Sequence, residues 1–301
     1  MIKTPVWNIG GGIRHGQNLI NYFIDRKQFY DTTHKLFNYV YDSIFGLKWN
    51  GGRVCMPEHT KTLKDLFAEI STYNDLGVGF NWSFTNLLLV PEDLQDEYCN
   101  LVLEATNNSL NGVILTSNIL RDHVRKNYPN MRIIYSVCNG LKTIEQYKKA
   151  LDENDIVVLH PDFNHNYPFL NELANIDGAN RIEIMVNDVC SFGCPFREQH
   201  YKNLSIYNKV QSACPIIHDK TELDYGSGLG CLAVRNGYNK DHRNKLSFTD
   251  LDYMLDLGFQ HFKLIGREHE WQYYYDVDLR PNLEQYWARK LVQECGQNLH
   301  I

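Results

Sequence analysis

Short β-rich runs separated by amphipathic helical stretches recur along most of this 301-residue chain. Helical segments such as LKDLFAEISTYNDLG and TIEQYKKALDEND place apolar residues three and four positions apart, with charged residues between them. Most β-rich runs are spaced by about 20 to 35 residues, which suits a strand followed by a crossover helix. The candidate strands lie near Ile44, Val78, Val113, Ile133, Ile156, Ile182 and Phe262. This repeat predicts an α/β fold with a parallel sheet.

The number of candidate strands favours a closed (β/α)8 barrel of the TIM type over an open, doubly wound sheet. Seven strands are visible, and the poorly patterned stretch from 202 to 243 is long enough to contain an eighth. We expect a single domain over residues 1–301, with the barrel at 46–267. Residues 1–45 are expected to form a helical N-terminal extension, and residues 268–301 a helical cover that includes NLEQYWARKLVQECG.

The charge and the cysteine content narrow the classes of function. The formal net charge is -6, and no dense block of Lys and Arg is present to neutralise a phosphate backbone, so DNA is not an expected partner. No apolar run reaches about 18 residues, and the N-terminus lacks the pattern of a signal peptide, which predicts a cytoplasmic protein without a membrane partner. Eight cysteines are too few for a disulfide scaffold in a chain of this length, so clustered cysteines indicate metal binding or chemistry.

Two of the cysteines of interest lie within the run EIMVNDVCSFGCPFREQHY and two follow it, and a candidate strand at 182–186 leads into this run. In a barrel, functional groups collect at the carboxyl ends of the strands, where this loop would lie. Four thiolates that converge can hold an iron-sulfur cluster, and zinc accepts the same ligands. The predicted ligands are Cys190, Cys194, Cys214 and Cys231; the alternative is that they are buried cysteines that act as small hydrophobic residues.

Other candidate residues lie near strand ends. In FKLIGR, Lys263 would point into the barrel, where Glu183 is positioned to supply its counter-charge, either as a structural ion pair or as a substrate-binding pair. Arg267 follows the same strand and is a candidate clamp for a carboxylate or phosphate. His160 and Asp162 follow another strand as candidates for acid/base or metal chemistry.

The run VGFNWSFT alternates two kinds of side chain. Aromatic residues occupy one face, and Asn81, Ser83 and Thr85 occupy the other. The polar face is expected to line the mouth of the barrel, which favours a pocket for a polar ligand.

Two segments, EIMVNDVCSFGCPFREQHY and LDYMLDLGFQHFKLIGR, resemble the hallmark segments of the collagenase-like peptidase family, peptidase U32. The runs WNGGR at 49–53 and FNWSFTN at 80–86 resemble an uncharacterised branch of that family. Members of that family resemble oxygen-independent hydroxylases of ubiquinone precursors and RNA bases, so the resemblance implies a [4Fe-4S] cluster on four cysteines. Cys190, Cys194 and Cys214 match the first three ligands. Asp252 occupies the place of the fourth, so either Cys231 completes the cluster or one iron stays open or bound to the Asp252 carboxylate. Ile265 stands where the family has Glu.

These observations favour an iron-sulfur barrel enzyme that carries out a redox or hydroxyl-transfer reaction on a small molecule or an RNA base. One alternative is a metal-dependent peptidase, with zinc on the cysteines or on His160 and His165. Another is a non-catalytic iron-sulfur accessory subunit that works with a paralogous protein partner.

Overall fold

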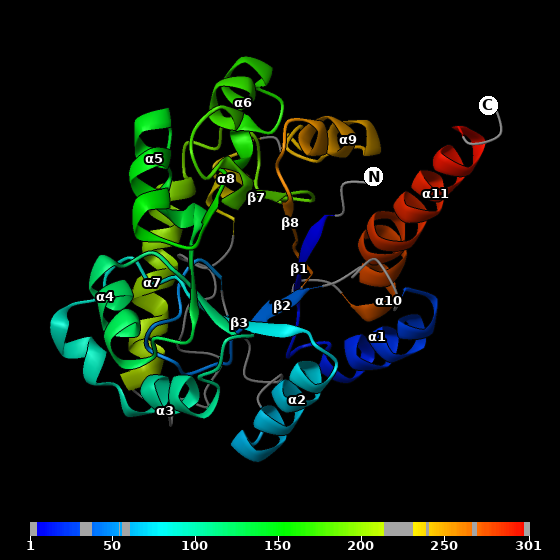
Figure 1. Cartoon of the computed structure of the whole chain (residues 1–301). Coiled ribbons are helices and arrows are strands. Elements are labelled where there is room, and N and C mark those ends of the chain that lie inside the picture. Colours follow the sequence, from blue (N-terminus) through cyan, green and yellow to red (C-terminus); the bar gives the residue numbers. More distant parts are fainter. Residues whose placement is uncertain are drawn as a thin grey trace.

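Parallel strands form a closed barrel at the centre of the molecule (Figure 1). The structure is a computed structural model that describes residues 5–30, 38–53, 55, 61–213, 231–238, 241–266 and 270–297. In this part of the chain, eight strands pair in sequence order and β1 closes the barrel against β8. The strands are β1 Val6–Gly10, β2 Tyr39–Asp42, β3 Gly79–Phe84, β4 Gly112–Leu115, β5 Arg132–Tyr135, β6 Ile156–Val158, β7 Ile182–Met185 and β8 His261–Leu264. The predicted (β/α)8 barrel is confirmed.

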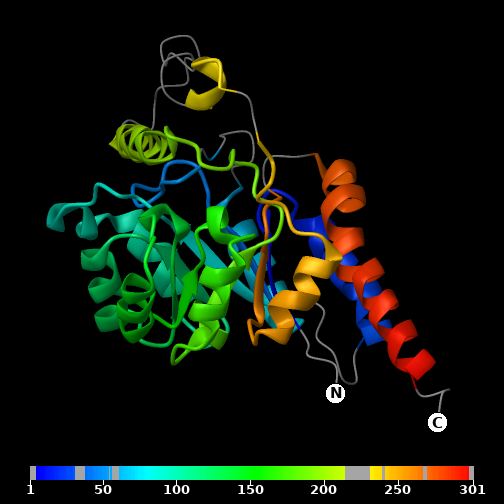
Figure 2. The same cartoon turned by 90° about the horizontal axis from the view of Figure 1, so that it is seen from above.

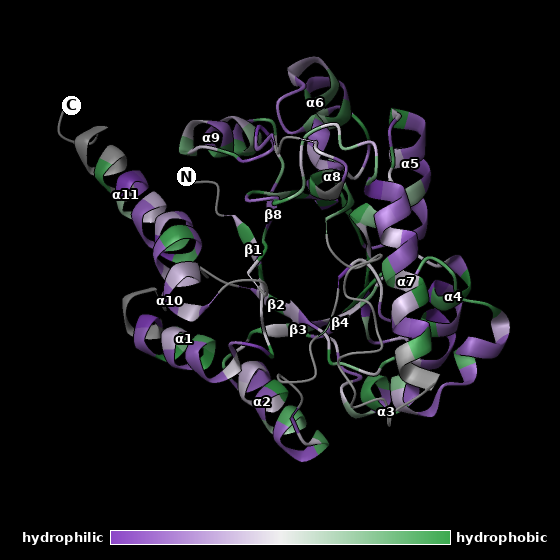
Figure 3. Cartoon of the chain, turned by 180° about the vertical axis from the view of Figure 1, so that it is seen from behind, coloured by the Kyte–Doolittle hydropathy of each residue, from purple (hydrophilic) through white to green (hydrophobic). Residues whose placement is uncertain are grey.

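Helices surround the strands. They are α1 Gly16–Tyr30, α2 Leu63–Asp75, α3 Glu97–Ala105, α4 Asn118–Asn127, α5 Ile144–Glu153, α6 Tyr167–Ala174, α7 Arg197–Ala213, α8 Leu232–Arg235, α9 Phe248–Asp256, α10 Trp271–Tyr274 and α11 Tyr286–Gln297. Single 3-10 turns occur at η2 Pro91–Gln95, η3 Val137–Asn139, η4 Pro161–Phe163 and η5 Ala179–Arg181. The helices carry both hydrophilic and hydrophobic residues along their length (Figure 3), as expected for elements with one face on a core and one in water. None of the helices within the described ranges is both long and apolar enough to cross a bilayer.

The prediction for the N-terminal region is wrong. Residues 1–45 do not form a helical extension, because they supply β1, α1 and β2. The eighth strand is therefore at Val6–Gly10, and the described part of 202–243 contains helices α7 and α8 but no strand. Only Trp7 and Ile9 give β1 an apolar face, and glycines follow it at once, so the local sequence reads as a loop.

The helix signals in the sequence correspond to the observed helices. Thr62 caps α2 by accepting a hydrogen bond from the Asp65 backbone N–H, and Thr143 with Gln146 forms a capping box at the start of α5. Each cap satisfies a backbone donor that the first turn of a helix leaves without an intrahelical partner. These caps explain why both predicted helices begin where the amphipathic pattern starts.

Two apolar layers hold the barrel together. The larger lies between strands and helices and includes Trp7, Phe80, Trp82 and Phe262, all fully buried. The smaller fills the barrel interior with Tyr41, Ile114, Ile134, Ile156, Val158, Met185 and Ile265. The outward aromatic face of β3 and the outward Phe262 and Leu264 of β8 therefore agree with the alternation predicted from the sequence.

The helix α7 lies over the carboxyl end of the barrel, and the short α8 lies farther out on the same side (Figure 2). Asn86, directly after β3, donates from Nδ2 to the Ser205 carbonyl of α7 at 3.1 Å. Asn208 of the same helix donates to the Arg53 carbonyl at 3.3 Å. Since both partners follow strand ends, α7 forms part of the wall of the barrel mouth.

The C-terminal helical run begins at Trp271, inside the range of 268–301 where the sequence predicts a helical cover. It passes from α10 through the π-helical segment η6 Tyr275–Gln285 into α11, which extends away from the barrel (Figure 1). Asp278 of η6 accepts a hydrogen bond of 2.8 Å from Asn187, which also bonds the backbone of Ile265. This contact joins the C-terminal helices to the ends of β7 and β8.

Candidate functional site at the barrel mouth

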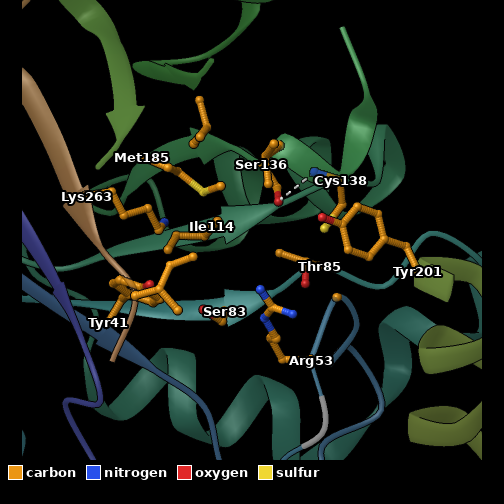
Figure 4. A pocket seen from close by; sticks show the side chains of 14 residues that line it. Tyr41, Arg53, Ser83, Thr85, Ile114, Ser136, Cys138, Met185, Tyr201 and Lys263 are labelled. Atoms are coloured by element: carbon orange, nitrogen blue, oxygen red, sulfur yellow. Dashed lines mark hydrogen bonds between the residues drawn. The ribbon is translucent and has the colours of Figure 1, made fainter. Parts of the chain in front are cut away.

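A pocket of about 60 Å³ opens at the carboxyl end of the barrel (Figure 4). Its wall is built from strand ends and from the loops and helix that follow them. The described residues that line it include two basic side chains, Arg53 and Lys263, and no acidic one. Hydroxyl groups come from Tyr41, Ser83, Thr85, Ser136 and Tyr201, a thiol from Cys138, and apolar surface from Ile114, Val137, Val158, Met185 and Ile265. Of the polar face predicted for β3 and the residue after it, Ser83 and Thr85 line the pocket, and Asn81 does not.

Lys263 enters the pocket from β8 and pairs with Glu183 of β7. The Lys263 Nζ lies 3.3 Å from Glu183 Oε2, and the two residues are 6% and 3% exposed. The ammonium also lies 4.1 Å from the centre of the Tyr41 ring, a cation–π contact. The ion pair predicted from the sequence is therefore present, and its lysine faces the pocket.

A chain of hydrogen bonds holds Glu183 in place inside the barrel. Asn8 donates to Glu183 Oε1 at 2.9 Å, and Asn81 donates to Asn8 Oδ1 at 3.2 Å. Arg132, at the start of β5, donates to Asn81 Oδ1 at 2.9 Å. This chain leads from the mouth towards the amino end of the barrel, so the carboxylate beside Lys263 has little freedom to move.

Arg53 reaches the pocket because of two glycines that precede it. A Cβ at Gly51 would lie 2.2 Å from the Thr85 carbonyl oxygen. Gly52 has a φ of +53°, and a Cβ there would lie 2.9 Å from both Cys138 Sγ and Thr85 Oγ1. Only glycine fits at these two positions, because the loop after β2 packs closely against the pocket wall. The guanidinium of Arg53 points into the pocket from that wall (Figure 4).

Arg53 also interacts with the cysteine loop, where its side chain hydrogen-bonds Cys190 and lies near Asp188. Burial raises the pKa of the Cys190 thiol, and the Asp188 carboxylate raises it further, against the opposing effect of Arg53 and Arg197. Burial likewise raises the pKa of Asp188, while Arg197 and Arg53 oppose it. Burial also raises the pKa of the Tyr201 phenol well above its usual range, so the pocket wall keeps a neutral hydroxyl there.

His160 and Asp162 lie beside this loop, away from the pocket lining. Arg197 donates to Asp162 Oδ1 at 2.9 Å and to the Ser191 carbonyl at 2.8 Å, which fixes the carboxylate. Burial lowers the pKa of His160 to about 4, and repulsion by Arg197 contributes. The imidazole is therefore neutral at pH 7, and its Nδ1 accepts a hydrogen bond from the Asp162 backbone N–H.

The cysteines predicted to hold a cluster are only partly described. Cys190 and Cys194 lie in the loop after β7, and Cys231 caps α8, whereas Cys214 lies outside the described residues, as does Arg267. Among the residues that the structure describes, no three Cys, His, Asp or Glu side chains are grouped as ligands of a metal ion. The predicted cluster on Cys190, Cys194, Cys214 and Cys231 and the alternative zinc site on His160 and His165 therefore stay predictions from the sequence.

Asp252, the alternative fourth ligand, is used elsewhere in the fold. It lies on α9, accepts a hydrogen bond of 2.7 Å from the Tyr286 hydroxyl, and pairs with Arg289 and Lys290 of α11. These contacts explain the Asp-Leu-Asp sequence in structural terms, as a junction between two outer helices.

Sequence reasoning missed several residues of the pocket. Arg53, Cys138 and Tyr201 come from a loop, a 3-10 turn and a helix that are far apart in the sequence. The sequence contains a signal for two of them: a pair of glycines precedes Arg53, and Cys138 lies three residues after the end of β5, at the functional face of a barrel.

No protein-family profile matches the chain, and no curated protein matches it in sequence. A solved structure described as the U32 peptidase Mk0906 is similar in fold, with a TM-score of 0.55 and 13% sequence identity. The match covers 87% of this chain and 92% of the other. The fold is therefore similar to that of a U32 peptidase, which agrees with the resemblance seen in the sequence.

Proposed function

We propose that this protein is an enzyme that binds a small anionic substrate in the barrel mouth. Arg53 holds the charged group of the substrate, and Lys263 faces its polar, reacting end. The observation that supports this is the composition of the pocket lining, which contains two cations and no carboxylate in a chain whose net charge is -6. A guanidinium can bind a carboxylate or phosphate through two parallel hydrogen bonds.

The burial of the charged pair of Lys263 and Glu183 also supports a ligand-binding site. The charged pair of Lys263 and Glu183 is costly to desolvate, and such pairs recur at functional sites because the fold holds them in a fixed geometry. Neutral hydroxyl groups surround the amine, so a substrate that carries oxygen atoms finds hydrogen-bond partners on several sides. The size of the pocket admits a group equivalent to about four water molecules.

Peptide hydrolysis is a second candidate reaction. The fold is similar to that of a protein described as a U32 peptidase, and Arg53 is suited to a peptide's terminal carboxylate as well as to a small acid. Incubation with short peptides and detection of new amino termini tests this reaction. If every peptide stays uncleaved under conditions where small acids bind, peptide hydrolysis is excluded.

The iron-sulfur cluster stays a prediction from the sequence, and no step of the proposed reaction uses it. Iron and sulfide analysis of anaerobically purified protein tests it. Iron that is lost in Cys190→Ser and Cys194→Ser would support the cluster, and protein without iron after anaerobic reconstitution would exclude it.

Thermal unfolding tests the proposed binding site. Acetate, pyruvate and phosphate should raise the melting temperature of the wild-type protein more than chloride at the same ionic strength, because a ligand that binds only the folded state stabilises it. The effect should disappear in Arg53→Gln and persist in Arg121→Gln. Arg121 is a suitable control, since it pairs with Glu153 on the outer surface of α4 and α5. A wild-type protein that no anion stabilises beyond chloride would contradict the proposal.

A further inference from the structure

We infer that Lys263 is an amine nucleophile that forms an imine with a carbonyl compound carrying a carboxylate, such as a 2-oxo acid. This inference rests on the proposed function, because Arg53 is the group that holds the carboxylate. It adds the substrate class and the reacting atom.

The position of Lys263 is suitable for an amine that attacks a carbonyl group. Its side chain is nearly buried and its Nζ lies at a pocket lined by hydroxyl groups and apolar side chains. Lysine amines attack carbonyl groups when they are removed from water and brought to the neutral form. An amine on the surface is strongly hydrated and protonated, and it lacks both advantages.

Glu183 supplies the proton acceptor that the reaction needs. Its Oε2 lies 3.3 Å from Nζ, and Asn8 fixes the other carboxylate oxygen at 2.9 Å. The carboxylate can take one proton from the ammonium, which leaves the neutral amine facing the pocket. Glu183 is a positioning residue here, because it acts on the substrate only through Lys263.

The chemical step then balances without any other reactant. The Nζ of the neutral amine bonds to the carbonyl carbon, and a proton passes from nitrogen to the former carbonyl oxygen to give a carbinolamine. The proton held by Glu183 passes to that hydroxyl group, which leaves as water while the C=N bond forms. The net change is one ammonium and one carbonyl compound to one iminium and one water, and Glu183 ends as the carboxylate.

The two basic groups of the pocket have separate tasks in this arrangement. Lys263 and Tyr41 lie at one side of the pocket, while Arg53 points in from another wall (Figure 4). A 2-oxo acid has its ketone directly next to its carboxylate, so it offers one group to Lys263 and another to Arg53. Ser83 and Ser136 line the same space and offer hydroxyl groups to the oxygen that becomes water.

Reductive trapping tests the inference. The full-length protein is incubated with pyruvate and sodium cyanoborohydride, which reduces an imine to a stable secondary amine, and the adduct is located by mass spectrometry of peptides. We expect one adduct per chain, on Lys263. Equal labelling of surface lysines such as Lys202 and Lys290, or no adduct at all, would overturn the inference.

Variants separate this inference from the proposed function. Lys263→Arg keeps the charge and should abolish the adduct, while anions still raise the melting temperature. Arg53→Gln should slow trapping of pyruvate and leave trapping of acetaldehyde, which has no carboxylate, unchanged. Stabilisation by pyruvate without trapping would overturn the imine and leave the proposed binding site intact, whereas absence of both would overturn both.

Glu183→Gln gives a readout that a structural role would not change. The amide keeps an oxygen that can accept from Asn8 but cannot hold and return a proton. Without the carboxylate the buried amine loses its proton more readily, but the carbinolamine hydroxyl lacks its proton donor, so trapping near pH 7 should be about a hundredfold slower. The rate should recover as the pH falls, because acid in solution then supplies this proton. A pH profile identical to that of the wild type would remove Glu183 from the reaction.

Discussion

The buried pair of Lys263 and Glu183 sets the energetics of the barrel mouth at the scale of single residues. Two charges that are almost fully buried depend on each other, because each would be unpaired in a medium of low dielectric constant if the other were removed. Their electrostatic attraction adds little net stability over a well-packed apolar pair. Stability alone therefore does not account for the pair, to which the proposed function assigns a role in binding.

Removing one charge of the pair should lower the stability of the fold more than removing both charges. Glu183→Gln is expected to lower the free energy of unfolding by about 3 kcal/mol, because it leaves the Lys263 ammonium without its carboxylate. The double variant Glu183→Gln/Lys263→Met should be more stable than Glu183→Gln alone, since it contains no buried charge. Urea unfolding measures all three forms, and a double variant that is less stable than the single one would contradict this explanation.

His160 gives the stability a dependence on pH. Its pKa is lowered from 6.5 to about 4 in the folded protein, so the unfolded chain binds the proton first as the pH falls. The contribution is fully present above pH 6.5 and is lost between 6.5 and 4, by roughly 3 kcal/mol in total. His160→Asn keeps a side-chain acceptor for the Asp162 N–H and cannot titrate. The loss of stability on acidification in urea should therefore be smaller in His160→Asn; equal losses would disprove the buried neutral imidazole.

The strand β3 shows how one element serves both the core and the site. Its outward residues Phe80, Trp82 and Phe84 are fully buried among the helices, whereas Ser83 lines the pocket together with Thr85, which follows the strand. The strict alternation of a strand separates these two tasks. Substitutions on the two faces should therefore have different effects.

Trp82→Ala should lower the free energy of unfolding by about 3–5 kcal/mol, because it empties a large space beside Phe84 and removes the hydrogen bond from Nε1 to Thr106. Ser83→Ala, one residue away on the other face, should cost less than about 1 kcal/mol and weaken anion binding instead. Denaturant unfolding and ligand titration of both variants check this. Equal loss of stability would mean that the pocket face is also structural core.

Elements with a full pattern could be predicted from the sequence. The alternation of side chains in β3 and β8 and the capping residues of α2 and α5 can be read from neighbouring residues, because alternation and capping depend only on the local sequence. The strand β1 could not be recognised, since its inward positions carry Asn8 and Gly10 and its partners lie far away in sequence. Its conformation is decided by tertiary pairing, which no local pattern reports.

At the scale of the whole molecule, the residues of the site could likewise be predicted only where their position depends on the local sequence. The inward direction of Lys263 and Glu183 follows from strand alternation, and the sequence predicts their pairing. Tyr201 and Arg53 reach the pocket only because α7 folds over the barrel mouth and the Gly51–Gly52 loop approaches Thr85. Such convergence depends on the closed barrel.

Closure of the barrel depends on β1, which pairs with β2 on one side and β8 on the other. Ile9→Pro should remove a hydrogen-bond donor from this ladder and place a ring where the backbone must stay paired. We expect loss of the cooperative unfolding transition and of near-UV circular dichroism, whereas Ile9→Val should keep both at a cost of about 0.5–1.5 kcal/mol. A proline variant that unfolds as cooperatively as the wild type would show that β1 is dispensable.

Calorimetric titration with pyruvate tests the anion site of the barrel mouth most directly. Wild-type protein and the surface control Arg121→Gln should bind pyruvate with the same dissociation constant. Arg53→Gln should bind it at least about tenfold more weakly, because it loses a charged hydrogen-bond donor to the carboxylate. Binding by Arg53→Gln that equals that of the wild type, or a wild-type protein that binds no pyruvate, would contradict the assignment of the pocket.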